Sequence, residues 1–289
     1  MVERAQFLLQ NRYLVVGVLL FAAICLVALL APWIVEIHLG PGVDPMSVGN
    51  FDIFQPPSPT NPLGTDRFGR DELALLLMGI RFSLTIGLLA GVIATTFGSS
   101  VGLIAGYYGG KVDNVLRTMT DMFLVIPSLP LLLTLSAYVA RIDIPTMAVL
   151  LAVFSWPFAA RTIRAQVLSL RERAYIDLAR ASGLSNLEIV FQEIMPNLFP
   201  YLGVSLAGSV IGAILAEFGL EVIGLGPGNV ATLGLMINWA IAWGSMSLGA
   251  WVLIFAPAVT LVLIFLALNL INIGLEQTFN PRLKGTTGQ

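Results

Sequence analysis

Few side chains in this chain of 289 residues could carry out chemistry. The single cysteine, Cys25, and the single histidine, His38, are too few for a disulfide within the chain or for a zinc site. A phosphate-binding loop needs the pattern G-x-x-x-x-G-K-[ST], but Ala105 and Val112 occupy two of the required positions around the only Gly-Lys pair, residues 110–111. The sequence therefore predicts no metal site, no cofactor bound by this chain and no ATP hydrolysis by this chain.

The most polar long segment, residues 161–197, has the pattern of two short helices joined at a glycine. It contains five arginines and four acidic residues. Residues 171–182 lack glycine and proline and favour a helix, and Gly183 can adopt the left-handed conformation that ends one. Ser185 and Glu188 have the spacing of a capping box, which predicts that a second short helix begins there.

This polar segment could bind a partner protein or lie on the membrane surface. Ala179 and Gly183, four residues apart, would leave one helix face without large side chains, so that a partner backbone could approach closely. Pro196 would close the second helix before the next apolar run begins. The alternative is an amphipathic loop helix that lies on the lipid headgroups.

The composition indicates that the solvent of this protein is largely lipid. Hydrophobic residues make up 57% of the chain and charged residues only 11%, against roughly 25% charged in ordinary soluble domains. A soluble protein of this length would have too few polar side chains to cover its surface. The net charge of −2 argues against nucleic acid as a partner, because that would need a clustered basic face. The chain is therefore predicted to be an integral membrane protein.

Six apolar runs approach or exceed the roughly 20 residues that a membrane-spanning helix needs. They are residues 13–35, 82–105, 119–140, 144–160, 198–220 and 248–275. None alternates like a barrel strand, so an all-α bundle is predicted. The predicted divisions are a cytoplasmic N-terminus 1–12, a first span 13–35, an external proline-rich loop 36–81, a five-helix core 82–275 with a cytoplasmic segment 168–197 that forms most of the polar segment, and a cytoplasmic tail 276–289.

Lysine and arginine residues between the spans predict the orientation, because they accumulate on the cytoplasmic side. With the N-terminus inside, the external segments hold four of them: Arg67, Arg70, Arg81 and Arg141. The internal segments hold eleven: Arg4, Arg12, Lys111, Arg117, Arg161, Arg164, Arg171, Arg173, Arg180, Arg282 and Lys284. Both termini are therefore predicted to be cytoplasmic.

The polar segment resembles the cytoplasmic loop motif of ABC-importer permease subunits. That motif is Glu-Ala-Ala, three residues, Gly, then about ten residues to an ending of aliphatic-x-Pro. Residues 177–179 (Asp-Leu-Ala) match its start, with Asp for Glu and Leu for Ala. Gly183 keeps its place, and residues 194–196 (Ile-Met-Pro) match the ending.

Three other stretches are similar to the second permease of dipeptide, oligopeptide and nickel importers. Residues 61–71 read Asn-Pro-Leu-Gly-Thr-Asp-Arg-Phe-Gly-Arg-Asp, with Arg-Phe-Ser-Leu at 81–84. Residues 107–113 read Tyr-Tyr-Gly-Gly-Lys-Val-Asp and are followed by Asp121 and by Ile-Pro at 126–127. Asn-Leu at 269–270 leads to Asn-Pro-Arg-Leu at 280–283. The resemblance covers residues 60–283.

The resemblance implies an all-α integral membrane protein with six transmembrane helices and the MetI-like permease fold of type I ABC importers. It implies a second homologous permease subunit, two cytoplasmic ABC ATPase subunits that hold ATP and Mg, and an extracytoplasmic substrate-binding protein. The setting would be the cytoplasmic (inner) membrane of a prokaryote, in contact with lipid. ATP binding would close the ATPase pair, pull the docked helices together and open the pore outward.

The resemblance also assigns candidate residues for coupling to the ATPases. These are Arg173, Tyr175, Asp177, Ala179, Arg180, Gly183, Glu188 and Pro196.

Polar and aromatic residues near the outer side are candidates for the substrate path or for contact with the delivery protein. Glu217 and Glu221 lie one turn apart, where they could meet a cationic group such as a peptide amine, or simply reach the outer water. Trp239 and Trp243 fit interfacial anchors, although they could stack on a sugar ring. On the cytoplasmic side, Arg117 and Asp121 would form an ion pair one helical turn apart.

Di- or oligopeptides are the favoured substrate, with oligosaccharides or nickel complexes as alternatives, because the delivery protein sets most of the specificity. A secondary transporter driven by an ion gradient is the rival from another class, and it would need broken helices and buried acids at mid-membrane. A membrane scaffold that transports nothing would not need a glycine-hinged docking segment.

Overall fold

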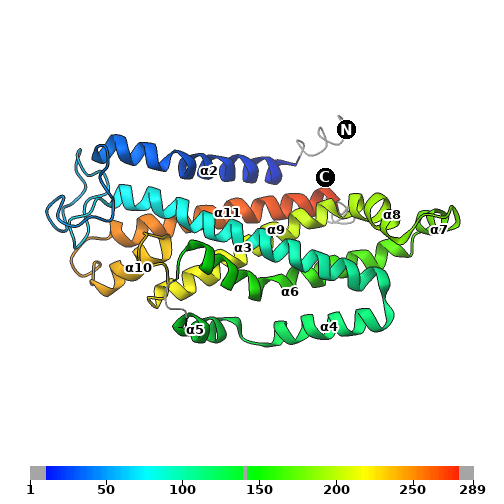
Figure 1. Ribbon diagram of the computed structural model, residues 1–289. Helices are drawn as coiled ribbons and strands as arrows, with labels where there is room; N and C mark the ends of the chain where they lie inside the picture. The colour runs from blue at the N-terminus through cyan, green and yellow to red at the C-terminus, as the bar shows by residue number, and fades with distance from the viewer. Residues whose placement is uncertain (1–10, 139–141, 280–289) are drawn as a thin grey trace.

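The computed structural model describes residues 11–138 and 142–279, and these residues form a bundle of long helices (Figure 1). Arg4, Arg141, Arg282 and Lys284, counted for the orientation, lie outside the described residues, as do the motif at 280–283 and most of both predicted end segments. The helices are α2 (Arg12–Leu39), α3 (Glu72–Tyr108), α4 (Gly110–Val125), α5 (Ser128–Tyr138), α6 (Ile144–Arg171), α7 (Ala174–Ala181), α8 (Asn186–Glu188), η1 (Ile189–Ile194), α9 (Met195–Val222), α10 (Leu233–Ala242) and α11 (Val252–Phe279).

Five helices of the described residues are long and apolar enough to cross a membrane, and α4 with α5 makes a sixth if the bent pair is one span. The prediction of an all-α membrane protein is therefore confirmed, and the predicted six spans are reached when the bent pair is counted as one, although several predicted bounds differ. The second span begins ten residues earlier than predicted, at Glu72, and the fourth continues to Arg171. The segment from α9 to α11, predicted as an external stretch, contains the short apolar helix α10.

The third span is broken rather than continuous. Helices α4 and α5 meet at an angle of 82°. Pro127 has no amide hydrogen to donate and excludes the helical conformation from the residue before it, so Ile126 is extended with ψ of 124°. The predicted span 119–140 therefore bends at residues 126–127.

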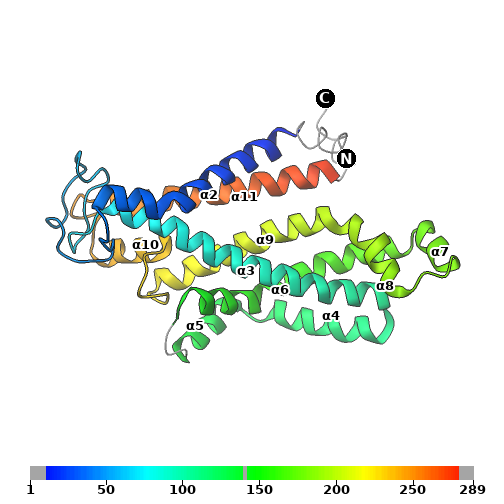
Figure 2. The same ribbon diagram turned by 45° about the horizontal axis from the view of Figure 1, so that its top comes forward.

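Helix α3 lies in the middle of the bundle and packs closely against α6 through small residues (Figure 2). Gly98, Gly102 and Gly106 are spaced four apart, on the side of α3 that faces α6. A Cβ atom at any of them would overlap α6, at the backbone of Trp156 or Ala160 or at the side chain of Val167. Because lipid gives apolar helices no hydrophobic reason to associate, this close approach supplies the van der Waals contact that holds the pair.

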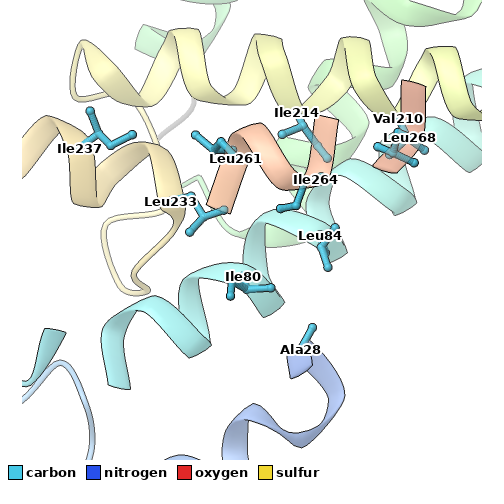
Figure 3. Close-up of a cluster of buried hydrophobic side chains, with 10 residues drawn as sticks. All are labelled: Ala28, Ile80, Leu84, Val210, Ile214, Leu233, Ile237, Leu261, Ile264 and Leu268. Carbon is cyan, nitrogen blue, oxygen red and sulfur yellow. The ribbon is translucent and has the colours of Figure 1, made fainter. Parts of the chain in front are cut away.

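A buried apolar cluster joins five helices of the bundle (Figure 3). Its members come from α2, α3, α9, α10 and α11, and they are Ala28, Ile80, Leu84, Val210, Ile214, Leu233, Ile237, Leu261, Ile264 and Leu268. Two of the ten belong to α10, so the cluster fixes this short helix to four long ones.

Candidate functional sites at the two ends of the bundle

The turn between α7 and α8 forms as the sequence predicts. Gly183 has φ of +83°, and its amide donates to Arg180 O at 3.0 Å while the Leu184 amide donates to Ala179 O at 3.2 Å. This bonding ends a helix at a left-handed residue. The Ser185 amide donates to Glu188 Oε2 at 2.7 Å and the Glu188 amide donates to Ser185 Oγ at 3.3 Å, which confirms the capping box. The chain therefore reverses direction in a fixed conformation.

The inner face of the α7–η1 segment is packed against the bundle. Ile176, Ile189 and Ile194 have no exposed surface, and they form one cluster with Ile163 of α6 and Tyr107 of α3. The Tyr107 hydroxyl also bonds to Asn186 Oδ1 at 2.8 Å. This segment, residues 172–194, is called the coupling lobe below. Because its inner face is a tightly packed core, any displacement of the lobe must move the helices it contacts.

The outer face of the coupling lobe exposes large apolar side chains beside charged ones. Leu178 is 68% exposed, Leu187 65% and Phe191 59%. Arg180 and Asp177 form an exposed ion pair at 3.4 Å between Nη1 and Oδ1. Apolar side chains beside charges on a projecting lobe are typical of a protein-binding surface.

The structure brings most of the predicted coupling residues to this outer surface. Arg173, Tyr175, Asp177, Arg180, Gly183 and Glu188 are exposed on the lobe, and Pro196 is exposed beyond its end, in α9. Ala179 is not: it is 8% exposed and packs inward, so the predicted bare face of Ala179 and Gly183 does not form. The reason is that the apolar face of α7 must cover Ile163 and Tyr107.

Pro196 does not close a helix as predicted. The chain runs from α8 through the π-helix η1 into α9 as one apolar rod, Asn186–Val222. Pro196 stands in the first turn of α9, where a missing amide hydrogen is tolerated. Leu187 and Phe191 were absent from the predicted site, although large apolar residues within a charged segment were a signal that could have found them.

Ion pairs and hydrogen bonds tie α6 to its neighbours next to the lobe. Arg164 Nη2 donates to Asp113 Oδ2 of α4 at 2.6 Å, and Arg171 Nη1 donates to Gly106 O of α3 at 2.9 Å. The predicted Arg117–Asp121 pair is confirmed at 3.5 Å and is half-exposed. Helices α3, α4 and α6 are therefore connected to one another by polar contacts near the start of the lobe.

At the other end of the bundle, Glu217 is buried between three helices. It is 1% exposed, and its Oε1 accepts a hydrogen bond from Ser83 Oγ of α3 at 3.1 Å. The same Ser83 Oγ accepts from the Leu233 amide at the start of α10, at 3.2 Å. Glu217 and Ser83 thus link α9, α3 and α10 through polar contacts inside the bundle.

Glu221 lies one turn further and is completely buried. Its side chain packs against Gly226 and Gly234, where an added Cβ atom would overlap the glutamate. The alternative that Glu217 and Glu221 simply reach outer water is therefore wrong. Their contact with a substrate or a delivery protein stays a prediction, because within this chain Glu217 meets Ser83 of α3 and Glu221 packs against Gly234 of α10.

The outer tryptophans belong to a cluster with the proline-rich loop. Arg70 pairs with Asp66, with Nε and Oδ2 2.6 Å apart, and its guanidinium lies 4.6 Å from the ring centroid of Trp239. Phe68 meets Trp243 edge-on at 5.5 Å between centroids. The loop and α10 therefore form one outer assembly, in which both tryptophans already contact residues of this chain.

Comparison with known proteins identifies the family. Residues 98–285 match the family described as binding-protein-dependent transport system inner membrane component. The chain belongs to this family. The oligopeptide transport system permease protein OppC of Mycobacterium tuberculosis is 36% identical over 266 residues, which are 90% of either chain. The dipeptide transport system permease protein DppC of Haemophilus influenzae is 31% identical over 285 residues, 95% of this chain and 92% of that one.

A solved structure agrees with the fold of this family member. A chain of the inward-facing MetNI methionine ABC transporter matches with a TM-score of 0.58 over 71% of this chain and 97% of its own length. At 20% sequence identity, this similarity concerns the fold alone. The MetI-like fold that the sequence implied is therefore confirmed for this permease.

Proposed function

We propose that this chain forms half of the pore of an ATP-driven, binding-protein-dependent importer of di- and oligopeptides. The observation that carries the proposal is the coupling lobe, which is packed into the bundle on one face and exposes Leu178, Leu187 and Phe191 on the other. A permease that hydrolyses no ATP needs such a part to receive motion from another protein. The peptide class is supported by relatives named oligopeptide and dipeptide permeases.

The partners of this chain follow from its need for another protein to hydrolyse ATP. A second homologous permease completes the pore, and two cytoplasmic ABC ATPases bind ATP and Mg and dock on the coupling lobes. An extracytoplasmic substrate-binding protein delivers the substrate. Helix α2 begins and α11 ends at the end of the bundle that carries α7 and α8 (Figure 1), which supports cytoplasmic termini in the inner membrane of a prokaryote.

The coupling step is a rigid-body movement. The lobe sits in a groove of the ATPase through its exposed apolar residues and through the charges of Arg173, Asp177 and Arg180. Tyr175 and Gly183 lie beside them. When the ATPases close, the lobe moves and its inner face displaces α3, α6 and α9 together. At the other end, Glu217, Glu221, Trp239 and Trp243 hold the outer assembly in place so that it moves with α9.

The docking part of the proposal is tested with Gly183→Trp. The space around a Cβ atom at Gly183 is open, so a side chain can begin there without meeting this chain, although the left-handed backbone is strained. We expect the bundle to insert while the ATPases no longer co-purify. Gly183→Asn is the matched control, because asparagine tolerates this conformation and adds less bulk. Normal recovery of the complex with Gly183→Trp would remove the docking assignment.

The transport part is tested in vesicles that contain the purified complex. A carrier driven by an ion gradient would also suit a bent span and buried acids, and this chain has both at α4–α5 and at Glu217. We expect uptake to require ATP and to continue when ionophores collapse all ion gradients. Uptake that follows the gradient instead would overturn the proposal. Binding of peptides, nickel complexes and oligosaccharides to the delivery protein then decides the substrate class.

A further inference from the structure

A polar cavity of about 280 Å³ lies between α3, α4 and α6, away from the outer face of the lobe and from the outer assembly. Three arginines line it, Arg117, Arg161 and Arg164, together with Asp121. Its remaining walls are small residues and Thr120, so the guanidinium groups are the main binding groups that it offers.

The charges around this cavity do not cancel. Arg164 is held by Asp113 through two hydrogen bonds, and Arg117 pairs with Asp121 at 3.5 Å. Arg161 is exposed and has no acidic side chain within ion-pair distance among the residues that the structure describes. One positive charge therefore remains for a ligand.

The cavity lies where two apolar runs of the sequence end, on the side of the coupling lobe. The apolar runs of α3 and α6 end at Ala105 and Ala160, and both residues line the cavity. A third lining residue, Val101, lies on α3 between Phe97 and Ile104, which are 55% and 44% exposed. Because these three residues are spaced four and three apart, they share one face of α3. The face forms an apolar strip beside the cavity, and Phe97 extends it toward the middle of the helix.

We propose that this cavity binds an anionic phospholipid, with its phosphate on Arg161 and Arg117 and an acyl chain along Phe97, Val101 and Ile104. A planar guanidinium binds a phosphate oxygen pair well, and basic pockets between helices at the membrane boundary bind anionic headgroups. A lipid with one net negative charge and an uncharged head, such as phosphatidylglycerol, balances the single free charge. A zwitterionic head would bring an ammonium group among arginines whose acidic neighbours are already paired.

The test measures lipid retention on the full-length chain, purified with its partner subunits, in phosphatidylcholine nanodiscs that contain a minor share of phosphatidylglycerol. Mass spectrometry counts the lipids that stay bound after exchange into detergent. We expect the wild type to retain phosphatidylglycerol in preference to phosphatidylcholine. Arg161→Gln should lower that retention about tenfold, the factor for a lost charge-assisted hydrogen bond. Arg161→Lys should keep part of it.

Arg81→Gln is the matched control, since it removes one exposed arginine from the opposite end of α3. Equal losses in Arg81→Gln and Arg161→Gln would show a general charge effect and overturn the proposal. Release of the bound lipid by millimolar inorganic phosphate would identify a site for free phosphate instead. Should Arg161→Gln change peptide uptake and leave lipid retention intact, the cavity would belong to the transport path. The preference of the wild type for phosphatidylglycerol over phosphatidylcholine is measured without any variant. If the wild type shows no such preference, the proposed site is refuted.

Discussion

The two ends of this permease differ in which side chains they expose and which they bury. At the lobe end, Leu178 and Leu187 are exposed together with Asp177 and Arg180. At the outer end, Glu217 and Glu221 are buried and bind or touch residues of α3 and α10. An end that leaves large apolar side chains exposed offers contact area to another protein, whereas the end that buries Glu217 and Glu221 encloses these side chains within its own helices.

The largest expected effect comes from the inner face of the lobe. Ile176→Asp places a carboxylate where the side chain has no exposed surface, among Tyr107, Ile163 and Ile189. We expect a loss of at least about 3 kcal/mol in the stability of this region. The measurement is thermal unfolding of the solubilised chain, combined with protease cleavage within residues 172–185. A variant as resistant as the wild type would show that the lobe is not anchored through Ile176.

Leu178, two residues after Ile176 in α7, lies on the outer face of the lobe, and we expect its substitution to have a different effect. Leu178→Asp changes a side chain that is 68% exposed, so stability should stay within about 0.5 kcal/mol of the wild type. Recovery of the ATPases should nevertheless fall sharply, because the apolar contact is lost. Co-purification at equal permease amounts measures this. If Leu178→Asp and Ile176→Asp lowered stability equally, the two faces would not be distinct.

The outer end is tested with Gly234→Ala, whose added methyl group would overlap the Glu221 side chain. We expect about 2 kcal/mol of destabilisation, typical of overpacking, while the ATPases still bind. Gly228→Ala, in the loop that precedes α10, is the control, because nothing lies within 4 Å of its Cβ position. Thermal unfolding with both variants measures the difference. Loss of ATPase binding in Gly234→Ala would contradict the separation of the two ends.

The smallest effect is expected at the exposed pair of Arg180 and Asp177. Their side chains are 47% and 72% exposed, so water and salt screen the attraction. Arg180→Ala should change the free energy of unfolding by less than about 0.5 kcal/mol. Any effect on ATPase recovery should therefore come from docking. A clear stability loss in Arg180→Ala would mean that the pair belongs to the fold.

Predictions from the sequence succeeded where a property depends on neighbouring residues. The capping box of Ser185 and Glu188 and the turn at Gly183 form as predicted, because each needs only a few consecutive residues. The bend at Ile126–Pro127 had the same kind of local signal, since a proline constrains the residue before it, but the apolar run across it suggested a continuous span.

The sequence by itself determined that this chain is an integral membrane protein with six apolar runs and a polar segment between two of them. These properties depend on composition and on the length of apolar runs, and neither requires contacts between distant residues. Only the tertiary structure decided that Ala179 turns inward while Leu178 turns outward, and that Glu217 meets Ser83 rather than water. Ser83 and Glu217 lie 134 residues apart in the chain. Such partners are set by the packing of whole helices, which no short stretch of sequence encodes.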